Sequence, residues 1–441
     1  MMNGHDRRTP AACPRPVART TPYTPARVVE LDLDAPEQLC APGGLGPVDP
    51  DGRVLALVRL HGHPLGLVSA TGTAGDPATL RRALVAAAHR ELRVPAPSTA
   101  APGPLPGRAG SARVPADGPT ATIIVCTRDR GPMLRECLDS VLGTAYPHTE
   151  VIVVDNAPSD DVTRELVRTC YADRVRYVHE PVAGLARARN TGLAAARGEI
   201  CAFTDDDALV DPGWVTAMVA AFASDDRIGC VTGLVLPAEL DTPAQEAFES
   251  YGGYAKGFAP HDWTWHDGDG ADDPLLPFAV GRFGTGANMA LRTEVIRGLG
   301  GFDEATGAGT PTRGGEDLLA FFRVMEAGYT VAYRPDAVAW HRHRRTDADL
   351  RNQIYGFGVG FGAYLTAAVV HRPRLIVPLA RRVPRGLHQW HSARRTRSGT
   401  AGRAGEGLHL GRKEFQGLLY GPISYLVSVR RRHTHRVEGM A

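Results

Sequence analysis

Short apolar runs alternate with amphipathic stretches through the middle of the chain, and this alternation restricts the fold more than any other feature of the sequence. Continuous apolar runs of this kind are typical of central strands in parallel sheets. The stretches between them, such as 133–142 and 185–196, carry apolar residues at helical spacing. The repeated strand–helix order predicts a doubly wound, mainly parallel α/β sheet. The predicted strands cover 121–126, 150–155, 175–178 and 200–204.

Polar side chains follow three of these strands at their carboxyl ends, where open parallel sheets bind ligands. Residues 127–130 follow the first strand, Asp155 ends the second, and three consecutive aspartates at 205–207 follow the fourth. Three adjacent anions repel each other, so we expect a cation beside them. Oxygen ligands suit Mg²⁺ or Mn²⁺, which commonly bridge to substrate phosphates. A solvated acidic turn is the alternative for the aspartates alone, but the other two strand ends favour a metal site.

Composition and the flanking sequence divide the chain into five predicted parts. Residues 1–26 are rich in Pro, Arg and Thr and are predicted to be disordered. Residues 27–93 predict a small, β-rich α+β module, and 94–119 form a Pro/Ala/Gly linker that we expect few contacts to cross. The α/β domain covers 120–345. A basic, partly helical extension covers 346–441.

Charge is distributed unevenly along the chain. The net charge of the whole chain is only +2, which argues against a nucleic-acid partner. From His341 onwards, however, 19 Arg and Lys residues face 5 Asp and Glu residues. The apolar segments 357–370 and 375–379 lie among these arginines and resemble an interfacial membrane segment, with packing on the α/β domain as the alternative. A basic region of this kind favours an anionic surface, which is a membrane face, a phospho-sugar polymer or nucleic acid. Peripheral contact with a membrane is expected as one of these options.

The predicted location is the cytoplasm, with peripheral attachment to the inner face of the membrane as an option. The seven cysteines are scattered, without metal-ligand spacing, and are expected to be reduced, buried thiols. The N-terminus lacks the apolar core of a signal peptide. No segment is expected to reach the roughly 20 apolar residues that a spanning helix needs.

Motifs in the α/β domain resemble those of the family-2 glycosyltransferases in both order and spacing. The nucleotide-binding half of that family is matched by the motifs at 123–130, 151–156, 184–190 and 203–207. The acceptor half is matched by the motifs at 284–292, 300–303 and 314–317. The resemblance covers roughly 120 to 345. It implies a GT-A fold, a nucleotide-diphosphate sugar as donor, with a UDP-sugar favoured, and inversion at the anomeric carbon.

The same resemblance assigns a metal site. Asp207 is the implied direct ligand of Mn²⁺ or Mg²⁺, and Asp205 and Asp206 face the ribose or the waters of the ion. His341 matches a position that often supplies a second metal contact, with a surface histidine in a basic loop as the alternative. Neighbouring arginines at 342, 344 and 345 either contact phosphate or are solvated charges.

The donor is expected to lie against the ends of the first two strands. Asp155 can accept hydrogen bonds from a uracil N–H or from ribose hydroxyls; its alternative role is a helix N-cap. The arginines at 130 and 189 can reach toward the diphosphate. The motif that contains Asn190 places it among the donor-binding residues, although its side chain is better suited to fixing the geometry of a loop. The full predicted set is Thr127, Arg128, Asp129, Arg130, Asp155, Asn190, Asp205 and Asp206.

The catalytic base is expected to be Asp317, beside Glu316, at the start of an apolar helix. A carboxylate at a helix N-terminus has an alternative role in capping, but a cap needs no second carboxylate. A base must first lie close to the acceptor oxygen and then have a suitable pKa. Gly286, Ala287 and Asn288 are expected in a tight turn on the acceptor side. Aromatic residues at 248–278 line an acceptor lid or simply pack within an insertion.

These observations predict an enzyme that moves one sugar onto a hydroxyl of a carbohydrate, lipid-linked or small-molecule acceptor, in cell-envelope polysaccharide synthesis. A processive synthase would need spanning helices and a Gln-x-x-Arg-Trp run, and Gln389-Trp390 lacks that pattern. A nucleotidyltransferase is the nearest different reaction, but its Gly-rich loop with a lysine is missing. An inactive carbohydrate-binding protein is the second alternative, and the intact carboxylate pairs argue against it.

Overall fold

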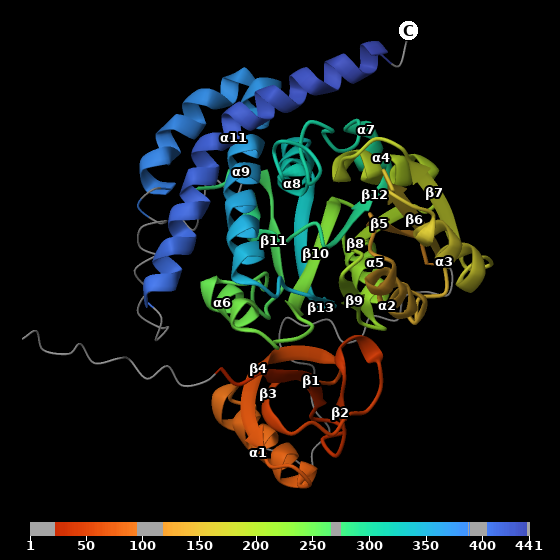
Figure 1. Ribbon diagram of the computed structural model, residues 1–441, viewed down its shortest axis with the longest axis vertical. Coiled ribbons are helices and arrows are strands. Elements are labelled where there is room, and N and C mark those ends of the chain that lie inside the picture. The colour runs from red at the N-terminus through yellow and green to blue at the C-terminus, as the bar shows by residue number, and fades with distance from the viewer. Residues whose placement is uncertain (1–22, 95–117, 266–274, 387, 389–403, 439–441) are drawn as a thin grey trace, which may run out of the picture.

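The computed structural model describes residues 23–94, 118–265, 275–386, 388 and 404–438 (Figure 1). Most of the predicted disordered segment 1–26, most of the linker 94–119 and Gln389-Trp390 lie outside the described residues. Within the described ranges the molecule consists of a small N-terminal module, a large α/β domain and a pair of long C-terminal helices.

The N-terminal module is a four-stranded sheet in the order β2-β1-β3-β4, covered on one face by α1. β1 pairs in parallel with β3, whereas β3 and β4 form an antiparallel hairpin. The apolar side chains of Leu80, Leu84 and Ala88 lie at helical spacing and are buried against the sheet. The elements are β1 (Ala26–Asp32), β2 (Leu39–Cys40), η1 (Pro42–Gly44), β3 (Gly52–Leu60), β4 (His63–Gly72) and α1 (Pro77–Glu91).

The large domain is built on one mixed sheet in the order β11-β13-β10-β12-β8-β5-β6-β7, with β9 pairing to β13. The pairs β5–β6, β5–β8, β6–β7 and β10–β13 are parallel, whereas β12 is antiparallel to both neighbours. The predicted mainly parallel α/β sheet is therefore confirmed. The strands are β5 (Ala121–Thr127), β6 (Thr149–Asn156), β7 (Val175–Glu180), β8 (Ile200–Asp205), β9 (Ala208–Val210), β10 (Ile228–Pro237), β11 (His261–Trp263), β12 (Asn288–Arg292) and β13 (Thr330–His341).

Helices cover both faces of this sheet and enclose two separate cores. Side chains of α2 and α5, including Leu138 and Phe222, pack on one face. Side chains of α4, α7 and α8, including Leu193, Ile296 and Phe321, pack on the other. This is the doubly wound arrangement that the sequence predicts. The helices are α2 (Gly131–Leu142), α3 (Val162–Cys170), α4 (Leu185–Ala195), α5 (Trp214–Ser224), α6 (Pro243–Tyr251), η3 (Val280–Arg282), α7 (Thr293–Gly298) and α8 (Glu316–Glu326).

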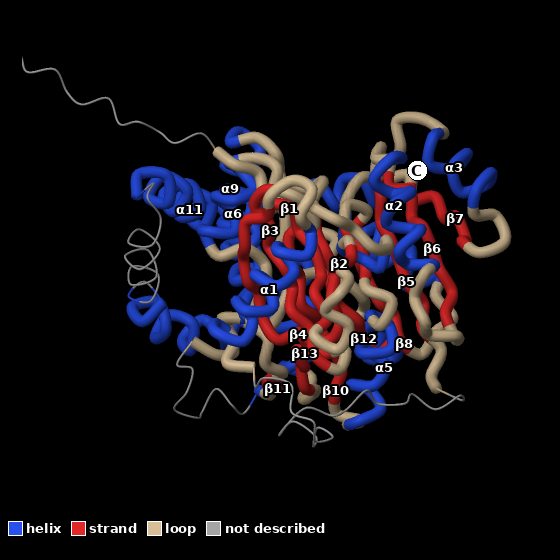
Figure 2. Tube along the Cα trace, turned by 90° about the horizontal axis from the view of Figure 1, so that it is seen from below, coloured by secondary structure: helices blue, strands red, loops and turns tan. Residues whose placement is uncertain are grey.

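The C-terminal extension contributes α9 (Asp347–His371), η4 (Pro373–Leu375) and α11 (Ala404–Glu438), and α9 and α11 lie side by side in both views (Figures 1 and 2). Glycines allow their backbones to approach closely. A Cβ atom added to Gly358 would lie 1.9 Å from the Glu414 carbonyl oxygen, and one added to Gly417 would lie 2.2 Å from that of Tyr355. Larger residues at these positions would push the helices apart.

α9 also corrects two expectations from the sequence. Among the described residues it is the one helix that is long and apolar enough to cross a membrane. The expectation that no segment has the length and composition of a spanning helix is therefore wrong. However, 56% of its apolar window is buried inside the protein. Residues 357–370 lie in this helix and largely pack against α11 and the α/β domain, which is the alternative role considered above.

The N-terminal module packs directly on the α/β domain, so contacts do cross between the two, contrary to expectation (Figure 1). Leu57 of β3 shares an apolar cluster with Leu209 of β9 and Trp340 of β13. The buried guanidinium of Arg59 pairs with Asp211 at 2.6 Å, just after β9. The module therefore supports the strands that lead into the site described next.

The described cysteines carry free thiols, as expected for a reducing environment. Cys137, Cys201 and Cys230 are buried, whereas Cys170 is exposed, so the expectation of buried thiols is wrong for Cys170.

Candidate active site

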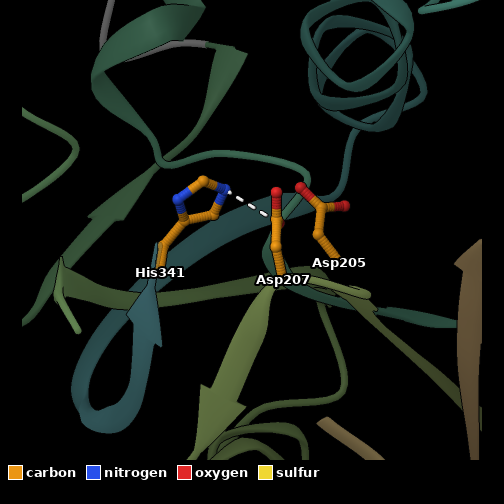
Figure 3. Close-up of side chains that lie close together, drawn as sticks. All are labelled: Asp205, Asp207 and His341. Atoms are coloured by element: carbon orange, nitrogen blue, oxygen red, sulfur yellow. Dashed lines mark ion pairs between the residues drawn. The ribbon is translucent and has the colours of Figure 1, made fainter. Parts of the chain in front are cut away.

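Three consecutive aspartates connect β8 to β9 and reach the end of β13. β8 ends at Asp205, and β9 begins directly after Asp207. Because β9 pairs antiparallel to β13 with Ala208 opposite His341, the histidine is brought beside Asp207. Its Nε2 lies 3.2 Å from Asp207 Oδ1, and the two side chains point toward each other with Asp205 alongside (Figure 3).

These three side chains could hold one divalent ion. One ligand atom from each of Asp205, Asp207 and His341 lies within 4.8 Å of the others. Asp207 and His341 are buried, so neither is the solvated surface group considered as an alternative. Two ligands of one ion, each at roughly 2.1–2.3 Å, are at most about 4.5 Å apart. The cluster therefore needs only a small adjustment to close around an ion.

Burial and neighbouring charges set the protonation of these carboxylates in opposite directions. Burial raises the pKa of Asp206 to about 6, and Arg130 offsets only part of this effect. Burial acts in the same direction on Asp207, but the charge of His341, its hydrogen bond and Arg130 together hold the Asp207 pKa below its usual value. Asp207 therefore stays ionised, as a metal ligand must.

Arg130 connects the first strand end with the aspartates. Its Nη1 donates to Asp206 Oδ1 at 2.9 Å and to Asp207 Oδ2 at 2.8 Å. The Thr127 hydroxyl donates to the other oxygen of Asp206 at 2.7 Å. Arg344 lies 4.0 Å from Asp207, so two cations flank this carboxylate.

The three arginines after His341 have different surroundings. Arg342 pairs with Glu136, and Arg345 pairs with Glu239 and Asp241, at the outside of the site. Of the three, only Arg344 lines the cavity above the aspartates.

An open cavity of about 360 Å³ lies above the aspartates. Its wall combines the ends of β5, β6, β8 and β13 with a loop before α8 and with α9. It continues toward a second cavity of about 550 Å³ beside α9, with which it shares Arg130, Arg344 and Gln353. The wall of the first cavity comprises Cys126, Thr127, Arg128, Arg130, Asn156, Leu185, Asp205, Asp206, Asp207, Tyr254, Ala308, Gly309, His341, Arg344 and Gln353.

Asp155 is buried at the end of β6 beside this cavity. Its Oδ2 accepts a hydrogen bond from the Tyr177 hydroxyl at 2.9 Å, while its Oδ1 has no partner among the described residues. Burial raises the pKa of Asp155 above its usual value. The alternative role as a helix N-cap is wrong, because α3 begins at Val162 and Asp161 precedes it. Arg128 lines the cavity, and Asp129 accepts a hydrogen bond from the Ser159 N–H at 2.8 Å.

The second pair of carboxylates stands at the N-terminus of α8. Gly315 precedes the helix with φ +93°, a backbone conformation that favours glycine, and it has no side chain to cap the helix. Asp317 Oδ1 accepts a hydrogen bond from the Leu318 N–H of the first turn at 2.8 Å, so Asp317 also takes part in the capping considered as its alternative role. Asp317 is partly exposed, and its Oδ2 accepts from the Gly286 N–H at 2.8 Å. Glu316 is buried, and burial together with the charge of Asp317 raises its pKa to about 7.

Arg189 of α4 links the two carboxylate groups. Its Nη1 donates to Glu316 Oε1 at 3.0 Å, and its Nη2 donates to the Gly286 carbonyl oxygen at 3.1 Å. The same Nη2 lies 3.6 Å from Asp205 Oδ1. The guanidinium is buried within these protein contacts.

A comparison with known families now adds to this geometry. Residues 122–299 match the family model described as glycosyl transferase family 2. Residues 122–299 are therefore similar to glycosyl transferase family 2 domains. The family expected from the motifs is therefore confirmed, and its matched region includes β5, β8 and β12 but ends before Glu316 and Asp317.

Relatives of this glycosyltransferase domain carry a range of names. A "Pre-mycofactocin glycosyltransferase" of Mycobacterium tuberculosis (strain ATCC 25618 / H37Rv) is 29% identical over 248 residues, which is 55% of this chain. This match spans about half of the relative's own length, 48%. A "Glucosyl-dolichyl phosphate glucuronosyltransferase" of Haloferax volcanii is 24% identical and matches 52% of this chain and 71% of the relative.

Solved structures with a related fold include a mannosyltransferase, PcManGT, from Pyrobaculum calidifontis in complex with GDP-Man and Mn²⁺. It is 20% identical, with a TM-score of 0.44, and the match covers 72% of this chain and 88% of that one. A structure of GalNAc-T7 with UDP, GalNAc and Mn²⁺ matches at 16% identity and a TM-score of 0.40, covering 59% and 52%.

Two asparagines of the predicted site face protein rather than the cavity. Asn288 is fully buried at the start of β12, where its oxygen accepts from Trp214 Nε1 and its amide donates to two backbone carbonyls. The Asn190 amide donates to the Phe302 carbonyl oxygen at 2.9 Å and accepts from the Phe302 N–H at 2.7 Å. These hydrogen bonds hold in place the turn that contains Gly286 and Ala287, and the loop before α8.

The sequence reasoning missed several residues of the cavity wall. Tyr254 lines the cavity, and its ring packs edge-on against His341 with centroids 5.1 Å apart. Gln353 of α9 donates a hydrogen bond to the Tyr254 hydroxyl at 3.0 Å. The aromatic segment 248–278 gave a signal for Tyr254. Gln353 gave none, because it lies in the helix beyond the predicted domain end at 345.

Proposed function

We propose that this chain is an enzyme that transfers one sugar from a nucleotide-diphosphate sugar to a hydroxyl acceptor at the cavity above Asp205–Asp207. One observation carries the proposal most directly: Asp205, Asp207 and His341 converge at the ends of β8 and β13, within the wall of one cavity. The family match over residues 122–299 supports the same reaction class.

The residues at this edge suit a divalent cation. Two carboxylate oxygens and one imidazole nitrogen suit Mn²⁺ better than Mg²⁺, which prefers oxygen ligands alone. When bound, such an ion supplies Lewis-acid stabilisation for the negative charge of the departing diphosphate. Asp207 is the proposed direct ligand, His341 the second, and Asp205 lies close enough to contact the ion or its waters.

The ends of β5 and β6 would hold the nucleotide. Asp155 Oδ1, which is buried without a partner among the described residues, can accept an N–H from a uracil base or a ribose hydroxyl. Asp129 stands at the edge of the same strand end. Arg130 and Arg128 can donate to the phosphates, since Arg130 needs only to turn from the aspartates. A UDP-sugar is the favoured donor.

Asp317 is the proposed general base. It is partly exposed and is oriented by the Gly286 N–H, whereas Glu316 is buried against Arg189 and is better suited to positioning. Proton transfer from the acceptor hydroxyl to Asp317, with direct attack on the anomeric carbon, gives inversion in one displacement. The acceptor is proposed to be a carbohydrate, a lipid-linked sugar or a small molecule, reached from the cytoplasmic side.

The test is release of nucleoside diphosphate from a panel of nucleotide sugars, with and without Mn²⁺. We expect turnover or slow hydrolysis of one donor that depends on the cation and fails in Asp207→Asn. If no nucleotide sugar is bound or hydrolysed under any condition, the proposed reaction is wrong. Donor binding without any turnover in the presence of varied acceptors would favour an inactive carbohydrate-binding protein.

A further inference from the structure

Exposed apolar side chains are concentrated in the C-terminal extension. Among the described residues, nine of the fourteen large apolar side chains that are exposed lie between 370 and 427. Five of them form what we call the apolar stripe of α11, with Leu419, Ile423 and Leu426 63%, 57% and 59% exposed. The other two members of the stripe are Tyr420 and Val427. Because neighbouring members along the chain are one or three residues apart, and Leu419, Ile423 and Val427 are four apart, all five lie on one face of the helix.

The opposite face of α11 is already used for packing within the protein. A Cβ atom added to Gly421 would lie 2.5 Å from Gly362 of α9, so the two backbones are in direct contact. Tyr425 is buried, and its hydroxyl donates to Asp303 at 2.9 Å. The helix therefore cannot turn its apolar stripe inward without losing these contacts, and the side chains of the stripe stay exposed. Figure 1 shows α11 at the outer edge of the molecule.

Positive charge surrounds the apolar stripe. Between residues 370 and 432 the sequence has 14 Arg and Lys residues against only two Glu residues. The stripe lies between Arg412 and Lys413 on one side and Arg431 on the other, and all three are exposed. Glu414 accepts a hydrogen bond from Tyr251 and is partly buried.

The segment after α9 repeats this combination. Val370, Ile376, Val377 and Val383 are exposed. Four arginines that are also exposed alternate with them along the chain: Arg372, Arg374, Arg381 and Arg385. Apolar and cationic side chains at the same surface are the composition of an interfacial membrane helix.

We propose that the apolar stripe of α11, with its flanking cations, docks on the surface of an anionic phospholipid bilayer. Apolar side chains would enter the boundary between headgroups and acyl chains, and arginines would contact phosphate. A second copy of this chain fits less well, because a two-fold contact is self-complementary and would bring the same cations together. The proposal does not depend on the sugar-transfer reaction, since it concerns a different surface.

Binding to vesicles tests this inference with the full-length protein. We expect cosedimentation with vesicles of phosphatidylcholine containing one-third phosphatidylglycerol, and at least about 10-fold weaker partitioning to phosphatidylcholine alone. The variant Leu419→Ser/Ile423→Ser/Leu426→Ser should lose about 10-fold or more on the anionic vesicles. In Arg412→Glu/Lys413→Glu, partitioning to the anionic vesicles should fall about 5-fold for each cation replaced. Added salt should weaken the binding of the wild type to the same vesicles.

A matched control replaces exposed apolar residues elsewhere. Leu45→Ser/Val162→Ser removes side chains that are 58% and 54% exposed, one in the N-terminal module and one in α3, and should bind vesicles as the wild type does. Circular dichroism confirms that each variant is folded. Equal partitioning of wild type and stripe variant would overturn the proposal. So would conversion of a dimer into a monomer by the stripe variant without loss of vesicle binding, because the stripe would then be a contact between copies.

Discussion

Two buried carboxylates, Asp207 on the proposed donor side and Glu316 on the proposed acceptor side, carry opposite electrostatic characters. On the donor side, Asp207 is buried against His341 and Arg130, and its pKa is held below the usual value. On the acceptor side, Glu316 is also buried, and burial together with the like-charged Asp317 outweighs its pairing with Arg189, so its pKa rises to about 7. Burial raises the pKa of both, so the partner decides the outcome.

This difference suits a division of labour within one reaction. A carboxylate that stays ionised can hold a cation, whereas Glu316, with its raised pKa, can carry a proton near neutral pH beside the proposed base Asp317. Arg189 touches Asp205 and Glu316 and keeps the two sides at a fixed separation.

Removing the donor-side charge should have the largest effect. Asp207→Asn keeps the shape of the side chain but loses the anion that pairs with His341. We expect the rate of transfer to fall about 10⁴-fold, because the transition state would lose several kcal/mol of stabilisation by the cation. The measurement is nucleoside diphosphate release with saturating Mn²⁺. Asp173→Asn, at an exposed aspartate before β7, is the matched control and should be as active as the wild type.

Removing the proposed base should come next. Asp317→Asn should lower transfer about 10³-fold, within the range for a general base, while leaving donor affinity unchanged. Calorimetric titration with the donor and steady-state turnover separate the two quantities. Turnover within a few-fold of the wild type would rule out Asp317 as the base.

Breaking the link between the groups should reduce stability. Arg189→Met leaves the buried Glu316 without its cation and removes the cation beside the half-buried Asp205, which should cost about 3–5 kcal/mol of unfolding free energy in urea titration. The double variant Arg189→Met/Glu316→Gln should recover part of this loss. Arg187→Met on the same helix removes a partly exposed pair with Glu304 and should cost about 0–1 kcal/mol. Equal losses for the two arginines would refute the linking role.

The raised pKa of Glu316 predicts a pH dependence of stability. Because the folded pKa, about 7, exceeds that of the unfolded chain, the folded state binds more protons across the window from about 4.5 to 7. Wild-type stability should therefore fall as pH rises through this window. Glu316→Gln lacks this contribution, so it should gain about 1–3 kcal/mol relative to wild type between pH 4.5 and 8. Parallel stability profiles for the two proteins would show that Glu316 does not titrate there.

The local pattern of the sequence was sufficient to predict four of the parallel strands, β5, β6, β7 and β8, and the polar ends of three of them, but not the parallel pair β10 and β13. Apolar runs such as Ile123–Val125 occur where a central strand is buried on both faces, so the pattern follows directly from burial. The aspartates at 205–207 were found because like charges in sequence need a counter-charge. The match of residues 122–299 confirmed the family that the motifs indicated.

Long-range pairings could not be predicted in this way. The antiparallel insertion of β12 between β10 and β8 turns Asn288 into the core, whereas its motif suggested the acceptor side. Gln353 reaches the cavity only because α9 folds back over the domain. The apolar stripe of α11 became visible only once the opposite face of that helix was seen to pack against α9.

Binding of Mn²⁺, followed by its electron paramagnetic resonance signal, tests the central claim that Asp207 and His341 form a cation site for a nucleotide diphosphate. We expect the wild type to bind Mn²⁺ more tightly when UDP or another nucleoside diphosphate is present, and Asp207→Asn to lose this coupled binding. The folded Asp173→Asn control should behave as the wild type does. Equal Mn²⁺ binding by the wild type and Asp207→Asn, with or without nucleotide, would contradict the account.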